Sequence, residues 1–315
     1  MADVAYIPGE RGHERRPAVG YAMVIAAALL FALNGTVSKV VLQSGISPLE
    51  LTQVRATGAF LGFALVLAVS RRESLRLTRR ELPYLVVFGI AGVALVQWLY
   101  FVSIGRLPIG IALLIEYIAP ILIAIWAWAV FKEQIRRRIW VALVLALAGL
   151  SLVVEVWGGL ALDGVGVAAA LAAAVAYMIY VLMAEHAVKW RDPASLTAYG
   201  FLFAALFWAA VQPLWRFPTG RLDDSVSLLG NLERFSLPVW LLLLYIVVAG
   251  TMVTFLLVAA ALRHISATRV GIVAMLEPVA ASAVAFLWLG ESFGPAQLVG
   301  GGIVLAAIFL AQTAR

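Results

Sequence analysis

Two glutamates lie deep inside long apolar runs and are the residues best placed to do chemistry. Glu116 and Glu277 each follow about nine residues of their run. In a helix each acid would be roughly 14 Å deep, close to the middle of a ~30 Å hydrocarbon layer. A carboxylate there usually faces a partner or a wet cavity. It could bind the ammonium group of a substrate or carry a proton. Alternatively, it could form a structural ion pair or a hydrogen bond between helices.

Cationic and polar residues near the acids are secondary candidates. Lys39 and Arg55 lie about one helical turn from the ends of the first two apolar runs. Long cationic side chains at that depth can reach the membrane surface, and they could pair with Glu50 or with a substrate carboxylate. Asn34 and Thr251 add polarity to two further positions inside apolar runs, each next to a glycine.

Aromatic and amide side chains near the middle of the apolar runs are candidates for the wall of a binding cavity. Positions 97 and 101 are about one helical turn apart, as are positions 177 and 180, so each pair shares a face. Their hydroxyl and amide groups could hydrogen-bond a polar ligand, although packing between helices explains any single one equally well. The candidates are Gln97, Trp98, Phe101, Tyr117, Tyr177 and Tyr180.

The remaining residue types argue against several kinds of chemistry. The chain has no cysteine, and His13, His186 and His264 lie beside charged segments. Cysteine-ligated metals and thiol nucleophiles are therefore excluded. The sequence also has no phosphate-binding loop, dinucleotide fingerprint or zinc-protease motif. We expect a protein that is not an enzyme, holds no metal or cofactor, and uses a gradient or the substrate itself as its energy source.

The composition requires a membrane around the elements that hold these residues. The chain has 315 residues, of which 64% are hydrophobic and 13% charged, whereas soluble domains carry about 25% charged residues. Mean hydropathy is +1.01. The net charge of +6 comes from short basic clusters between apolar runs, which is typical of membrane topology. We therefore expect a lipid bilayer as a partner and no nucleic acid.

Ten apolar runs are long enough for helices that cross a membrane. A transmembrane barrel would show alternating segments of about ten residues instead, so the predicted fold is an all-α polytopic membrane protein. The runs are Ala18–Val41, Leu51–Ser70, Leu82–Ile104, Pro108–Phe131, Ile139–Trp157, Val165–Ala187, Ser195–Trp215, Pro238–Leu262, Thr268–Leu289 and Ala296–Thr313.

Lysines and arginines predict which loops face the cytoplasm. They cluster before the first run and between runs two and three and runs four and five, and they follow runs six and eight. The loops Gln43–Glu50 and Glu155–Gly164 carry none. Because short cytoplasmic loops are enriched in these residues, both termini are expected in the cytoplasm, with residues 1–17 as a cytoplasmic tail. The long loop Arg216–Phe235 is expected to be a solvated external segment.

An internal repeat divides the chain into two halves. The stretch Leu114–Arg136 recurs loosely at Ile272–Gly294, with the two prolines and the two glutamates of each copy at one offset. Arg136–Arg138 follow the first copy, whereas no cation follows the second before Arg315. A repeat whose loop charge reverses indicates an inverted membrane repeat, an architecture of many transporters. The paired residues are Pro120 with Pro278, and Glu133 with Glu291.

The two prolines fall in the middle of their predicted helices. A proline there removes a backbone hydrogen bond and kinks the helix, and the freed carbonyl is tolerated where it lines a cavity. We expect Pro120 and Pro278 to act as kinks or hinges beside the acids. The domain boundaries would be 18–157 for a first repeat of five helices and 165–313 for a second, inverted repeat.

Two segments resemble a known family. Tyr100–Pro120, which reads YFVSIGRLPIGIALLIEYIAP, is similar to the third and fourth spans of EamA-type members of the drug/metabolite transporter superfamily. Met275–Glu291 is similar to the ninth span, and the Glu-x-x-x-Pro and Glu-Pro forms most resemble the threonine/homoserine exporter branch. The resemblance covers Ala18–Thr313 and implies ten helices in two inverted five-helix halves. Members carry amino acids, nucleotide sugars, purines, polyamines and drugs, so the cargo stays open.

These observations favour a secondary transporter of the bacterial cell membrane. The leading hypothesis is an exporter of small metabolites such as amino acids, working by alternating access around Glu116 and Glu277, with proton coupling as an option. The alternatives are an efflux pump for lipophilic cations and a membrane sensor or scaffold without transport. Runs five and ten have almost no polar groups at depth, and Gly300–Gly302 permit close helix contact. We expect both at the periphery, where they could form a homodimer.

Overall fold

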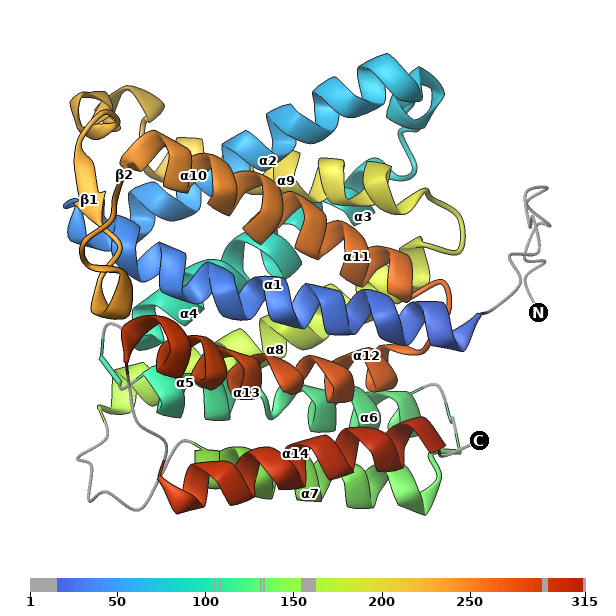
Figure 1. The fold of residues 1–315 in the computed structure, drawn as a ribbon. Coiled ribbons are helices and arrows are strands. Elements are labelled where there is room, and N and C mark those ends of the chain that lie inside the picture. Colours follow the sequence, from blue (N-terminus) through green and yellow to red (C-terminus); the bar gives the residue numbers. More distant parts are fainter. Residues whose placement is uncertain are drawn as a thin grey trace.

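The computed structural model describes residues 16–104, 106–107, 109–130, 132, 134–153, 163–290 and 294–313. Most of the described chain forms long helices that lie roughly parallel or antiparallel to one another (Figure 1). Eight helical segments are long and apolar enough to cross a membrane: Pro17–Gln43, Pro48–Ser70, Leu82–Ser103, Ile111–Ala129, Gly164–Ala187, Pro193–Val211, Val239–Ala261 and Ala267–Leu289.

Some spans are single helices and others are interrupted. Four spans are continuous: α1 (Pro17–Gln43), α2 (Pro48–Ser70), α8 (Gly164–Ala187) and α9 (Pro193–Val211). The third span joins α3 (Leu82–Val87), η2 (Phe88–Ala94) and α4 (Leu95–Ile104), and the fourth joins α5 (Ile109–Glu116) and α6 (Ala119–Ala129). The second half repeats this pattern in α10 (Val239–Val247), η6 (Val248–Val253), α11 (Thr254–Ala261), α12 (Ala267–Ala274), α13 (Leu276–Val284) and η7 (Ala285–Leu289).

The remaining two predicted spans contain α7 (Arg137–Val153) and α14 (Pro295–Thr313). Their apolar helical parts are shorter, so the described residues support eight spans, and the count of ten stays a prediction. Trp157, Glu133 and Glu291 lie outside the described residues, as does most of the predicted cytoplasmic tail.

The bundle has two distinct ends. We call the end where α1 begins and α14 finishes the termini end, and the end that carries the strands β1 (Ser225–Ser227) and β2 (Ser236–Pro238) the hairpin end (Figure 1). Short polar side chains start several helices. Ser47 and Glu50 form a reciprocal capping box at α2, and Asp192 accepts hydrogen bonds from the first turn of α9. These caps satisfy N–H groups that have no partner within the helix.

Both prolines of the repeat follow a break in their span. α5 and α6 are separated at Tyr117–Ile118, and α12 and α13 are separated at Met275. Pro120 and Pro278 then occupy the first turn of the next helix. A proline is tolerated there because it lacks only an N–H that would have no helical partner. Tyr117 and Met275 are equivalent positions at the repeat offset, so the two halves break their helices at the same place.

The contacts between helices follow the same two-fold pattern. α1 packs on α12, α13 and α11, which belong to spans nine and eight. In the other half α8 packs on α5, α6 and α4, which belong to the equivalent spans four and three. Two further large contacts pair equivalent helices directly, α2 with α9 and α7 with α14. Each half therefore supplies a surface that the other half covers.

The hairpin end departs from the predicted all-α fold. The loop expected to be a solvated segment, together with the residues that flank it, contains β1 and β2, an antiparallel pair in which Val226 is opposite Leu237. It also contains the 3-10 turns η3 (Leu214–Arg216), η4 (Thr219–Arg221) and η5 (Gly230–Leu232). The loop is anchored to the end of span nine. Trp288 Nε1 donates to the Leu228 carbonyl at 2.6 Å, and Asn231 donates to the Leu287 carbonyl at 3.1 Å. Both bonds are accepted by backbone carbonyls, so a hydropathy pattern, which depends on side chains, could not predict them.

α7 and α14 pair at the edge of the bundle, as the lack of deep polar groups predicted (Figure 1). Glycines at their crossing bring the two backbones close together. A Cβ atom at Gly300 would lie 2.5 Å from the Gly149 carbonyl oxygen and 2.7 Å from Leu152 Cβ. A Cβ atom at Gly302, on the same helix, would meet nothing within 4 Å.

Gly300→Ala is therefore expected to destabilise the protein. The added methyl must push two backbones apart, and overpacking of this kind costs about 1–3 kcal/mol. Gly302→Ala is the matched control, which should be neutral or slightly stabilising because alanine favours helix. Thermal unfolding of both variants in detergent checks the prediction, and equal midpoints would contradict the close crossing.

Candidate functional site

The centre of the site is a hydrogen bond between the two interrupted spans. Tyr117, at the break between α5 and α6, donates from Oη to Glu277 Oε2 at 2.8 Å. Glu277 lies in the first turn of α13, directly after the break of span nine. The partial positive charge at a helix N-terminus favours a carboxylate there. Each half of the chain thus brings one polar group to the same point.

Glu116 joins this pair from the last position of α5. It is close enough to Glu277 for the two carboxylates to interact electrostatically. Both acids are half-buried, although each lies in the interior of its span. Two like charges in an apolar surrounding are unfavourable together, so the pair favours a bound proton or cation.

Arg55 supplies the positive charge of the site. It lies on α2, is 8% exposed, and donates from Nε to Thr251 Oγ1 at 3.1 Å. Thr251 lies in η6 and is fully buried, and its hydroxyl donates to the Ile246 carbonyl at 2.7 Å. Arg55 also interacts electrostatically with Glu277. A buried cation needs compensation of this kind.

Tyr100 is a member of the site that sequence reasoning missed. It is half-buried and interacts electrostatically with Arg55, Glu116 and Glu277. The signal was present in its spacing, because position 100 follows Gln97 by about one helical turn. Gln97 itself is buried and donates to the Val93 carbonyl at 3.3 Å.

Tyr177 contributes to the site from α8. It is half-buried and interacts electrostatically with both Glu116 and Glu277. Its ring lies 6.2 Å from that of Tyr180, as their shared face predicted. Tyr180 itself packs in an aromatic cluster.

That aromatic cluster fills the bundle between the acids and the termini end. Phe88 and Phe201 follow the termini-end starts of α3 and α9 by about two turns, or roughly 9–12 Å. The Tyr180 ring is 5.5 Å from both the Phe88 and the Phe255 rings, and the Phe201 ring is 5.0 Å from Phe255. All four side chains are buried.

The remaining predicted residues divide into buried and exposed ones. Asn34 is buried against η6, where its Oδ1 would lie 2.0 Å from a Cβ at Gly250, so only glycine fits. Among the described residues, Asn34 Oδ1 and Gln97 Oε1 find no hydrogen-bond partner in the protein. Such buried acceptors usually bind water or a ligand. Trp98 is 43% exposed, and the side chain of Lys39 is exposed as well.

Phe101 is half-buried, and its ring lies 5.7 Å from Tyr100. Its ring is therefore next to a member of the site. The structure brings together Glu116, Glu277, Tyr117, Tyr177, Arg55 and Thr251 from the predicted set, and adds Tyr100.

Arg191 ties together the helix ends at the termini end. Its guanidinium bonds Glu81 at 2.6 Å, Ser195 at 3.0 Å, and the carbonyls of Ser74 and Arg76 at 3.2 Å. The side chain is only 6% exposed. These partners come from η1 (Arg72–Leu75) and its flanks, from the start of the third span and from α9. Arg191 therefore links the ends of spans two, three and seven. In the sequence, Arg191 is one of the basic residues after run six that predict a cytoplasmic loop, and nothing there indicated these contacts.

Comparisons with known proteins agree on one family of transporters. The model of the EamA-like transporter family matches residues 18–155 and again 164–313, which confirms the resemblance seen in the sequence. The uncharacterized transporter YwfM of Bacillus subtilis is 27% identical, over 92% of this chain and 93% of its own. An uncharacterized transporter of Archaeoglobus fulgidus is 28% identical, over 93% and 96%.

A third relative has a named cargo. The threonine/homoserine exporter RhtA of Escherichia coli K12 is 26% identical, over 94% of this chain and 92% of its own. A solved crystal structure with 18% identity covers 93% of this chain and 96% of that chain with a TM-score of 0.75, and so shares the fold.

Arg191→Lys should destabilise the protein although it keeps the charge. Lysine cannot reproduce the planar fork that serves four partners, and the lost hydrogen bonds should cost about 1–3 kcal/mol. Arg80→Lys, an exposed arginine between α2 and α3, is the matched control and should be neutral. The thermal midpoint in detergent is the measurement. A midpoint for Arg191→Lys equal to that of the control would contradict a fastening role.

Proposed function

Because the chain belongs to the EamA-like transporter family, we propose that it is a secondary transporter that exports small metabolites, in particular amino acids or related amphiphiles. It is an integral protein of the bacterial cell membrane. The observation that carries the proposal is the bond from Tyr117 to Glu277, in the electrostatic field of Arg55, where two interrupted spans meet. Broken helices around a site between repeats are typical of transporters.

The charges of the site suit a zwitterion. Glu116 and Glu277 would hold an ammonium group, and Arg55, once released from Thr251, would hold a carboxylate. The hydroxyls of Thr251 and Tyr100 would serve a polar side chain of the substrate. The relative RhtA, named as a threonine/homoserine exporter, supports amino acids as the cargo class.

Access to the site would alternate between the two ends. We place the termini end in the cytoplasm, because the basic loops lie there. The aromatic cluster and the Arg191 contacts then close the cytoplasmic side. Opening toward the cytoplasm would require the rings of Phe88, Phe201 and Phe255 to separate. A proton taken up by the glutamate pair would relieve the repulsion between two carboxylates and couple transport to a proton gradient.

A second candidate is an efflux pump for lipophilic cations. The observation that favours it is the excess of acids, since two carboxylates surrounded by tyrosine rings face a single arginine. An aromatic cation would bind acids and rings and would gain nothing from Arg55. The two functions therefore differ in their need for this residue.

Glu277→Gln and Glu116→Gln should each abolish most transport. A glutamine fits the same space and still accepts the Tyr117 hydroxyl, so folding is retained while charge is lost. The loss of one charged contact corresponds to roughly a 10–100-fold lower rate at subsaturating substrate. Efflux of radiolabelled threonine from proteoliposomes is the measurement, with the exposed Glu73→Gln as control. Normal transport by both variants with an unchanged pH profile would show that the acids have no such role.

Arg55→Gln separates the two cargo classes. Amino-acid efflux should fall roughly tenfold or more, because the substrate carboxylate loses a charged partner, whereas efflux of a lipophilic cationic dye should persist. Arg55→Lys should retain part of the amino-acid activity. Dye and threonine efflux are measured in the same proteoliposomes, and thermal unfolding confirms that both variants are folded. Full threonine efflux by Arg55→Gln would rule out carboxylate binding at this residue.

A further inference from the structure

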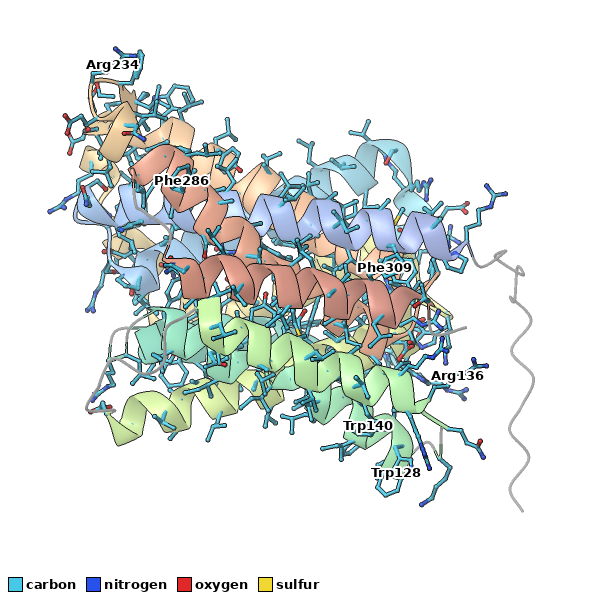
Figure 2. The ribbon with its side chains drawn as sticks, turned by 60° about the horizontal axis from the view of Figure 1, so that its bottom comes forward. Trp128, Arg136, Trp140, Arg234, Phe286 and Phe309 are labelled. Carbon is cyan, nitrogen blue, oxygen red and sulfur yellow. The ribbon has the colours of Figure 1, made fainter. Side chains whose placement is uncertain are left out.

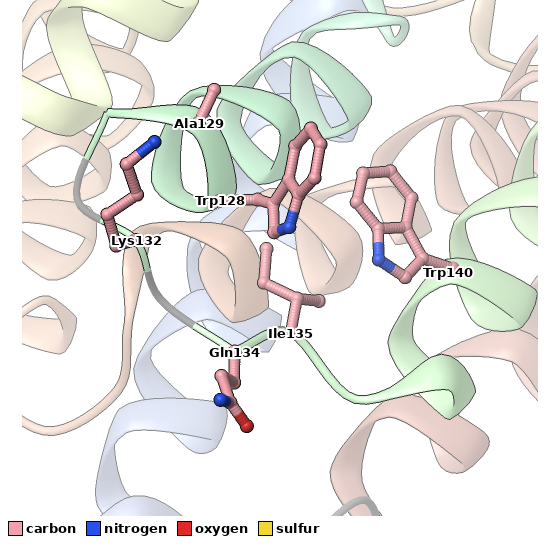
Figure 3. A pocket seen from close by; sticks show the side chains of 6 residues that line it. All are labelled: Trp128, Ala129, Lys132, Gln134, Ile135 and Trp140. Carbon is pink, nitrogen blue, oxygen red and sulfur yellow. The ribbon is translucent and has the colours of Figure 1, made fainter.

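A groove at the termini end lies outside the transport site. It is lined by residues of the connection between α6 and α7 and of the adjacent helix ends, and its volume is about 730 Å³ (Figure 3). Two indole rings flank it, and Lys132 lies on the opposite side of the first ring from the second (Figure 3). The lining residues are Trp128, Ala129, Lys132, Gln134, Ile135 and Trp140.

The walls of the groove combine an apolar surface with an open rim. Trp128 is 60% exposed, while Trp140 and Ile135 are half-buried, so their apolar atoms face the groove and its surroundings. Lys132 and Gln134 are exposed. Lys132 has a φ of 56°, in the left-handed region that side chains other than glycine rarely adopt. The chain turns sharply there, just beside Trp128.

The positive charge is concentrated next to the groove. The segment from 132 to 138 holds Lys132 and Arg136–Arg138 against a single acid, Glu133, which lies outside the described residues. All four cations are exposed. Trp128, Arg136 and Trp140 gather at one end of the molecule, opposite Arg234 (Figure 2). Tryptophan at the ends of apolar helices marks the level of lipid headgroups.

The equivalent connection of the second half lacks this charge. No lysine or arginine occurs between Arg269 and Arg315. The two connections lie at opposite ends of the bundle, and the cations belong to the one at the termini end, as the distribution of basic loops predicted. The groove lies beside this charge.

We propose that the groove binds one anionic phospholipid of the leaflet at the termini end. Lys132 and Arg136 would hold the phosphate and the charged headgroup, and the indole rings with Ile135 would hold the start of an acyl chain. Charge complementarity selects the occupant, since clusters of cations at a helix end attract anionic lipids. The groove opens at headgroup level, where both parts of such a lipid are available. This site is independent of the transported substrate.

Binding is tested with delipidated full-length protein in neutral detergent. Bromine-labelled phosphatidylglycerol should quench the fluorescence of Trp128 and Trp140, and phosphatidylcholine with the same chains should bind roughly tenfold or more weakly, as the loss of a headgroup charge near cations implies. Comparison with Trp128→Phe/Trp140→Phe isolates their signal from that of the other tryptophans. Equal affinity for the two lipids would overturn the proposal. So would quenching that is the same in the Phe variant.

Paired variants locate the headgroup. Lys132→Gln/Arg136→Gln should lose the preference for phosphatidylglycerol, whereas Arg79→Gln/Arg80→Gln should keep it. The control removes two exposed cations from the connection between α2 and α3 at the same end. Loss of the preference in both variants would mean diffuse surface charge and would overturn the site. Inorganic phosphate should not displace the lipid at millimolar concentration, and displacement would identify an ion site instead.

Discussion

The carboxylate of Glu277 is the group on which the middle of the protein depends. An acid at the centre of a membrane costs about 2.5–3.5 kcal/mol on insertion scales. One hydrogen bond to a charged group contributes about 1.5–3 kcal/mol, and Tyr117 donates such a bond. The positive charge of Arg55 adds to this compensation. α2, the break in span four and the start of α13 must therefore stay together, because separating them exposes a charge to hydrocarbon.

The helix breaks make this arrangement reachable. In a continuous helix the backbone groups would bond one another, and Tyr117 would stay on one fixed face. The break leaves backbone groups without helical partners, and in a membrane only protein or water can satisfy them. The two broken spans meet closely. A Cβ atom at Gly271 would lie 3.1 Å from Pro120 Cβ, so a small residue in one half lets the proline of the other half approach. The breaks are thus held at the interface between the halves.

The sequence predicted the parts of the site that depend on depth and repetition. Apolar runs place Glu116 and Glu277 in the interior of their spans. The repeated prolines predicted a kink in the middle of each span, and the structure has a break just before Pro120 and Pro278 instead. The sequence did not predict which side chains of a helix face the site, because this depends on the rotation of the helix about its axis. Gln97 is buried while Trp98 is exposed, because neighbouring residues point about 100° apart on a helix. The partners of Arg191 come from three separate segments, and no local pattern reports such a contact.

The two halves contribute unequally, and this inequality has a consequence for the site. The first half supplies Arg55, Tyr100, Glu116 and Tyr117, and the second supplies Tyr177, Thr251 and Glu277. If the two inverted halves were identical, a substrate would meet the same groups in either of two opposite orientations. With the only buried cation of the described site on one half, a zwitterion has a single favourable orientation. An asymmetric cargo therefore matches the chain better than a symmetric one, although both would fit the same two-fold scaffold.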